Sequence, residues 1–218
     1  MAKLKLVIAN KKYSSWSLRP WMALTMAGIP FDEVLIRFGE PRFGREIRKI
    51  SGAGKVPVLL DGRQTIWDSL AILEYLHECY PEKNLWPKAK AARAMARSVC
   101  SEMHSGFSAL RKACPMNLAR PIKPVPMNAA IKADVARIEA LWRQCRKAHG
   151  KGGKFLFGRF GNADAMFAPV ATRFETYAIP VATDTRAYMD AVMGTKAFQA
   201  WKSAGVKEPW IVAEDEVD

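Results

Sequence analysis

The sequence lacks the features that define several common protein classes. None of its apolar runs approaches the roughly 18 residues of a membrane span. The apolar stretch near its start is too short for a secretion signal. Its four cysteines are far apart and form no Cys-x-x-Cys pair, so they predict free thiols, not a disulfide scaffold or zinc ribbon. We therefore expect a cytoplasmic globular protein with no metal and no membrane partner.

Acidic residues are scarce in one part of the chain. The 218 residues include 34 Lys+Arg and 21 Asp+Glu, a net charge of +13, and half of them are hydrophobic, as in a folded protein. Residues 82–151 alone carry 15 basic and 4 acidic side chains. Such a stretch can attract nucleic acid or anionic ligands. Because it has no nucleic-acid motif and few interleaved aromatics, we expect a solvated surface or one that attracts anionic substrates, and no nucleic-acid partner.

Strand and helix signals alternate over the first 80 residues. Alternating or apolar runs predict strands at 3–9, 31–38, 55–60 and 65–67. A helix follows the hydroxyl pair Ser14-Ser15 and ends at Gly28, and a second helix spans 68–80. This order predicts a small mixed α/β domain over residues 1–81.

The remainder of the chain is helical in pattern. After a proline-bracketed linker at 81–87, an apolar stripe predicts one long helix over 95–110, and another stripe predicts a helix over 131–145. Four prolines make 114–127 a connecting loop, and further helices are expected at 164–177 and 195–204. Residues 88–218 should form an all-α domain.

Three loops of the α/β domain carry groups suited to binding. Pro57 cannot donate a ladder hydrogen bond, so it indicates an edge position or a cis bond. Asp68 and Ser69 open a helix whose N-terminus attracts a carboxylate. Ser14-Ser15 opens another helix. Together these loops suit an extended, peptide-like anion.

These residues resemble the glutathione-site motifs of the glutathione S-transferase family, and the resemblance spans the whole chain. The matching segments are Tyr13-Ser14-Ser15-Trp16-Ser17-Leu18-Arg19, Lys55-Val56-Pro57 and Asp68-Ser69-Leu70-Ala71-Ile72. Gly161-Asn162-Ala163-Asp164 resembles the family's buried N-capping box. The resemblance implies a thioredoxin-like N-terminal domain followed by an all-α C-terminal domain.

The resemblance also implies roles for individual residues. Ser14 matches the serine that serine-type members, the zeta class especially, use to hold the glutathione thiolate, and Ser15 is the adjacent alternative. A hydroxyl donor favours the charged sulfur and lowers the thiol pKa. The alternative for both serines is helix capping alone.

The remaining glutathione contacts follow from the same match. Val56, before Pro57, would pair its backbone with the cysteinyl part of glutathione. Asp68 and Ser69 would take the γ-glutamyl amino and carboxylate groups. Lys55 and Arg42 would meet the glycine carboxylate, with a solvated surface as their alternative.

The sequence departs from the family pattern at three places. Asp68 stands where Glu or Gln is more common. Trp16 stands where zeta enzymes carry a cysteine, which weighs against their isomerase reaction. Residues 1–78 contain no cysteine, which argues against thiol transfer.

The resemblance places the second substrate between the two domains. The predicted pocket combines Trp16 with residues of the first long helix, Met103, His104, Phe107 and Arg111. Instead of lining the pocket, the apolar residues could pack in the core, and His104 could be an ordinary surface histidine.

Three functions remain open. The first is a glutathione transferase that conjugates the thiolate to a small electrophile. The second is a glutathione-dependent isomerase of the zeta type. The third is a non-catalytic binding or stress protein. In each case the resemblance implies a homodimer.

Overall fold

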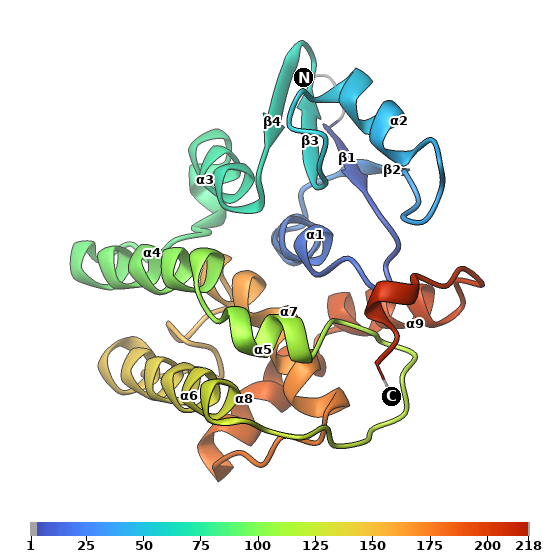
Figure 1. Cartoon of the computed structure of the whole chain (residues 1–218). Helices are drawn as coiled ribbons and strands as arrows, with labels where there is room; N and C mark the ends of the chain where they lie inside the picture. The colour runs from blue at the N-terminus through green and yellow to red at the C-terminus, as the bar shows by residue number, and fades with distance from the viewer. Residues whose placement is uncertain (1–3, 218) are drawn as a thin grey trace.

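A four-stranded mixed sheet organises the N-terminal part of the protein in the computed structural model, which describes residues 4–217 (Figure 1). The strands are β1 (Leu4–Ile8), β2 (Phe31–Leu35), β3 (Val58–Asp61) and β4 (Gln64–Trp67), in the order β2-β1-β3-β4. β1 runs parallel to β2 and antiparallel to β3, which forms a hairpin with β4. The helices of this part are α1 (Ser15–Ala27), α2 (Phe43–Ile50) and α3 (Ser69–Cys79).

Residues on the two faces of β1 enter separate hydrophobic cores. Leu6 and Ile8 join the main core with residues of α1 and α3, whereas Val7 packs with Ile47 of α2. Successive side chains of a strand point to opposite faces, so this alternation seats α1 and α3 on one face and α2 on the other.

The rest of the chain is helical (Figure 1). Its helices are α4 (Lys90–Ser105), α5 (Ser108–Ala113), α6 (Ala129–His149), α7 (Asn162–Thr176), α8 (Thr183–Met193) and α9 (Lys196–Val206), with 3-10 turns η1 (Pro81–Lys83) and η2 (Ala213–Asp215). Nearly every residue of α7 is buried. A helix that is buried on all sides lies at the centre of a core, and here α7 packs against both α1 and α4.

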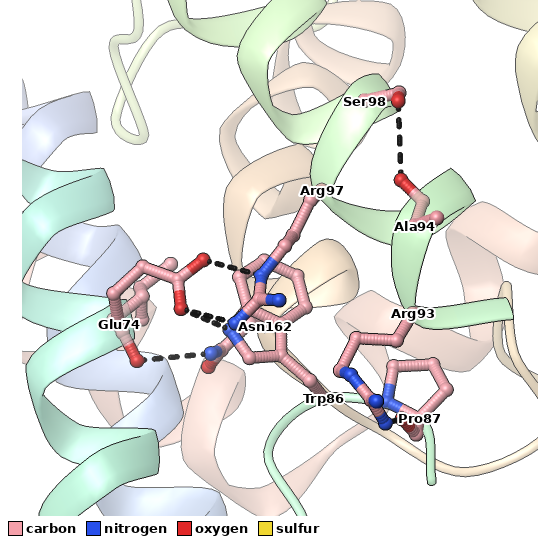
Figure 2. A network of polar contacts seen from close by, with 9 residues as sticks. Glu74, Trp86, Pro87, Arg93, Ala94, Arg97, Ser98 and Asn162 are labelled. Carbon is pink, nitrogen blue, oxygen red and sulfur yellow. Dashed lines mark hydrogen bonds and ion pairs between the residues drawn. The ribbon is translucent and has the colours of Figure 1, made fainter. Parts of the chain in front are cut away.

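The linker between the two parts is anchored by Trp86 (Figure 2). Its indole Nε1 donates to Oε2 of Glu74 on α3 over 3.0 Å. The same carboxylate accepts two hydrogen bonds of 2.8 Å from Arg97 on α4. One glutamate therefore joins the sheet domain, the linker and the first helix of the helical domain.

Several arginines of the basic middle region are paired. Arg97 bonds Glu74, Arg137 bonds Glu102, and Arg143 bonds Asp184. These ion pairs are largely exposed, so each contributes at most about 1 kcal/mol to stability. Part of the positive charge of residues 82–151 is thus paired with carboxylates on other helices.

The α/β-then-helical order agrees with the prediction, but two helices were missed and three expected elements were wrong in detail. Helices α2 and α8 were not predicted. The predicted helix over 95–110 is two helices, because the chain breaks at Gly106 and Phe107, whose φ of 56° is left-handed. The strand predicted at 55–60 starts only at Val58, after the cis Val56–Pro57 bond, and the one at 31–38 ends at Leu35.

The sequence also predicted free cysteines and no membrane-spanning helix. All four cysteines are free thiols, with Cys79 exposed and the others buried. Among the helices built by residues 4–217, none has the length and apolarity to cross a membrane.

Candidate functional site

A cavity of about 300 Å³ lies between the sheet domain and the helical domain. The loop before β3 and the start of α3 form one wall, and α4 and α5 contribute to the other. The lining residues are Trp16, Ala53, Lys55, Val56, Pro57, Trp67, Asp68, Ser69, His104 and Arg111. A second cavity of about 350 Å³ lies against the linker and the start of α7, and contains none of the predicted site residues.

Asp68 and Ser69 occupy the start of α3. Oδ1 of Asp68 accepts from the backbone N–H of Leu70 over 2.8 Å, which caps the helix. Its backbone is left-handed, with φ of 76°, a conformation that residues other than glycine adopt rarely and mostly at functional sites. The Ser69 hydroxyl is buried and has no hydrogen-bond partner within residues 4–217. This wall therefore holds an unused donor beside a helix N-terminus.

His104 joins the two walls of the cavity. Its Nε2 lies 2.6 Å from Oδ2 of Asp68, so α4 contacts the cap of α3 directly. Both side chains are partly exposed. The second Asp68 oxygen is thus engaged by a titratable group of the helical domain.

Two guanidinium groups lie close to the ring of Trp16. The Cζ of Arg19 is 3.9 Å from the centre of the Trp16 ring, and that of Arg111 is 4.9 Å away. His104 approaches the edge of the same ring at 5.2 Å. Cations favour the electron-rich face of an indole, so the ring stabilises two like charges that would otherwise repel.

The two arginines differ in their surroundings. Arg19 is fully buried and donates from Nε to the Met166 carbonyl on α7 over 3.0 Å. Burial and then the neighbouring Arg173 and Arg111 lower the pKa of Arg19. Burial also lowers the pKa of Arg111, whose Nη1 donates to the carbonyls of His104 and Gly106. The cavity thus has a positive side facing the helical domain.

The two candidate serines open α1. Ser14 is the N-cap: its Oγ lies 2.8 Å from Oγ of Ser17 and accepts weakly from the Ser17 backbone N–H. Ser15 is the first residue of the helix, and its hydroxyl makes no hydrogen bond to the described chain. Both residues are buried and neither lines the cavity, whereas the next residue, Trp16, does.

Comparison with known proteins gives the family. A family model described as "Glutathione S-transferase, N-terminal domain" matches residues 13–79, which contain every motif segment of the cavity's sheet-domain wall. The chain is 28% identical over 192 residues to glutathione S-transferase Z1 of Arabidopsis thaliana, covering 82% of this chain and 85% of that protein. These matches support the glutathione S-transferase family for this chain.

Other family members extend the match to both domains. Rat maleylacetoacetate isomerase is 29% identical over 192 residues, covering 85% of this chain and 87% of that enzyme. Among solved structures, a Burkholderia glutathione transferase homolog with bound glutathione aligns over 93% of this chain and 98% of its own, with a TM-score of 0.71 and 20% identity. A diazinon-metabolizing glutathione S-transferase of the silkworm Bombyx mori covers 94% and 98%, with a TM-score of 0.73 and 17% identity. These structures confirm the thioredoxin-like domain followed by an all-α domain.

The cavity brings together most of the residues singled out in the sequence. Eight of them line it: Trp16, Lys55, Val56, Pro57, Asp68, Ser69, His104 and Arg111. Met103 and Phe107 do not, because both are buried in the main hydrophobic core. Core packing therefore describes these two residues better than a position in the pocket. Arg42 is exposed, precedes α2 and is not on the cavity wall.

Two lining residues were missed in the sequence. Ala53 lies in the turn after α2, a helix that the pattern did not reveal. Trp67 ends β4 and is 54% exposed, which is unusual for so large an apolar side chain. The signal available in the sequence was only that a tryptophan directly precedes the Asp68-Ser69 pair.

Proposed function

We propose that the protein is a glutathione-dependent transferase that joins the glutathione thiolate to a small electrophile. The observation that carries this proposal is the buried, unpartnered hydroxyl of Ser69 at the start of α3, in one cavity with Lys55 and Val56. A tripeptide with a carboxylate at each end suits these groups. Ser69 and the α3 N-terminus would receive the γ-glutamyl carboxylate, and Lys55 the glycine carboxylate.

In this proposal, residues at the start of α1 activate the glutathione thiol. Ser14 is the first candidate and Ser15 the second. A hydroxyl proton rotates freely, so the Ser14 proton that now points to Ser17 can turn toward a bound sulfur. Lowering a thiol pKa from about 8.5 to about 6.5 stabilises the thiolate by about 2.7 kcal/mol. The positive N-terminus of α1 acts in the same direction.

The electrophile would occupy the side of the cavity formed by Trp16, His104 and Arg111. Only Nη1 of Arg111 is bonded within the described chain, so its other N–H groups can bind an acceptor on the substrate. An electrophile that carries a carboxylate fits this guanidinium best, because Arg binds carboxylates through two parallel hydrogen bonds.

A glutathione-dependent isomerase is the second candidate, supported by the match to rat maleylacetoacetate isomerase. In that reaction the thiol adds to the substrate and leaves again, so no glutathione is consumed. Both reactions need the thiolate and the same carboxylate contacts. They differ in whether glutathione stays bonded to the product or is expelled again.

Calorimetric titration with glutathione tests the shared step. We expect saturable binding to the wild type, and binding that weakens in Ser69→Ala. The absence of any glutathione binding would overturn the proposal. Binding without turnover of any electrophile would instead favour a non-catalytic binding protein.

Product analysis then separates the two enzyme reactions. A transferase consumes one glutathione for each aryl halide or haloacid converted, whereas an isomerase converts a cis-enone with glutathione unchanged. Sedimentation velocity of the same sample tests the homodimer that we infer from the family.

A further inference from the structure

The loop that leads into the two serines is held by a distant part of the chain. This loop joins β1 to α1, and Figure 1 shows the red C-terminal segment lying beside the blue connection between these two elements. Lys11, Lys12 and Tyr13 immediately precede Ser14, and each of them contacts a residue beyond 200 in the sequence. The placement of the serines therefore depends on the far end of the chain.

Every backbone polar group of residues 11 and 12 is bonded to a distant partner. The carboxylate of Glu208 accepts from the N–H of Lys11 over 2.8 Å and from that of Lys12 over 3.0 Å. The Lys11 carbonyl accepts from the indole of Trp201 over 2.9 Å, and the Lys12 carbonyl from the Leu118 N–H over 3.1 Å. Buried backbone groups need such partners, so these four bonds determine where the loop lies.

The helix that carries this contact is built for close approach. A Cβ on Gly205 of α9 would lie 2.9 Å from the Lys11 carbonyl carbon and 2.9 Å from the Lys12 nitrogen. Real Cβ atoms do not approach backbone so closely, so only glycine lets α9 and the loop pack at this distance. Glu208 lies three residues after Gly205, just beyond the end of α9, and its N–H donates to the Gly205 carbonyl over 3.1 Å.

A second contact lies one residue nearer the serines. The Tyr13 hydroxyl bonds the Glu216 carboxylate, whose other oxygen accepts from Nδ2 of Asn117 over 3.0 Å. Tyr13 itself is only 3% exposed. The C-terminal segment 201–217 thus holds the loop at residues 11, 12 and 13 in turn.

We propose that Glu208 is a positioning residue for thiol activation, acting through the 11–13 loop on Ser14 and Ser15. This inference depends on the proposed use of a serine to stabilise the thiolate. A hydroxyl that shifts by about 1 Å loses most of its hydrogen bond to sulfur, whereas the groups that bind the glutathione carboxylates lie on other loops. Loss of Glu208 should therefore change the thiol and leave glutathione binding in place.

The experiment measures the pKa of enzyme-bound glutathione from the ultraviolet absorbance of its thiolate, together with kcat and the KM for glutathione. In Glu208→Ala and Glu208→Gln, we expect the bound thiol pKa to rise by about 1 and kcat at neutral pH to fall about tenfold. The KM for glutathione should change less than about twofold. Glu208→Gln keeps one acceptor and the side-chain volume, which protects against loss of the fold.

Glu214→Gln is the matched control, because Glu214 lies in the same segment, is exposed, and makes no hydrogen bond to residues 11–13. It should leave the thiol pKa and kcat unchanged. An unchanged thiol pKa in the folded Glu208 variants would overturn the inference, and so would unfolding of both, since Glu208 would then be structural only. A wild type that binds no glutathione would instead refute the proposed function.

Discussion

The Ser69 hydroxyl on the cavity wall and the Asp164 carboxylate at the start of α7 have opposite hydrogen-bonding states. On the cavity wall, among residues 4–217, the Ser69 hydroxyl has no hydrogen-bond partner and only Nη1 of Arg111 donates hydrogen bonds. At the start of α7, Asp164 accepts from the Leu156 and Gly161 N–H groups and from the Tyr188 hydroxyl, at 3.0, 2.9 and 3.1 Å. A buried group with a free hydrogen-bond donor indicates a place for a ligand, whereas a buried group whose hydrogen bonds are all made within the protein indicates a structural role.

This comparison predicts that the two regions respond differently to mutation. Substitutions at the cavity should change kinetics and leave stability nearly unaltered. Substitutions beneath α7 should lower stability and leave the kinetics of the folded enzyme unaltered. The variants below test this separation, from the largest expected effect to the smallest.

Asp164→Ala should give the largest effect. The change leaves three donors without an acceptor in a fully buried site, so the free energy of unfolding should fall by at least about 3 kcal/mol. Urea denaturation measures this loss, and kcat/KM per folded molecule should stay at the wild-type value. A stable Asp164→Ala variant would refute the structural role.

The loss in Asp164→Ala should also depend on pH. Burial raises the Asp164 pKa from 3.8 to about 6 in the folded protein. The native state then holds a proton that the unfolded state has released, so the stability contributed by Asp164 declines as pH rises from about 4 to about 6. The difference between wild type and Asp164→Ala should be larger at pH 5 than at pH 7.5.

Ser14→Ala is expected to have the largest effect on catalysis. Loss of the donor to sulfur should lower kcat/KM by about 100-fold, equivalent to about 2.7 kcal/mol. Ser15→Ala is the matched control and should cost less than tenfold. A reversed order of the two variants would transfer the role to Ser15. Melting temperatures show how far the loss of the α1 cap contributes.

Ser69→Ala should weaken glutathione binding about tenfold. A hydrogen bond to a carboxylate contributes about 1.5 kcal/mol. Removal of the Ser69 hydroxyl breaks no hydrogen bond within residues 4–217. Calorimetry measures the affinity, and thermal unfolding without ligand should be unchanged. A marked fall in melting temperature would contradict the comparison, because it would show that the hydroxyl serves the fold.

Arg111→Gln should have a small and selective effect. The KM for an electrophile with a carboxylate should rise about fivefold, while the KM for its neutral analogue stays constant. Arg137→Gln, on the exposed ion pair with Glu102, provides the control. Equal changes for both electrophiles would remove Arg111 from substrate recognition.

Much of the site was visible in the sequence because short segments carry it. Lys55 to Pro57 and Asp68 with Ser69 are contiguous, and the same local rules that end a strand or cap a helix place them. The long helix predicted over 95–110 was wrong because apolar spacing persists through the break at Gly106 and Phe107. Spacing alone suggested that Met103 and Phe107 reach the pocket, but Met103 belongs to the buried stripe of α4, and Phe107 packs into the same core at the break.

The sequence by itself determined the two-domain order, the cavity loops of the sheet domain and the resemblance to the glutathione S-transferase family. These features depend on periodicity, caps and motifs within a few residues of each other. Only the tertiary structure decided the contact of His104 with Asp68, the stacking of Arg19 and Arg111 on Trp16, and the hold of Glu208 on Lys11 and Lys12. Those contacts join residues 36 to 197 positions apart, except for Arg19 with Trp16, and no local preference encodes which distant groups will meet.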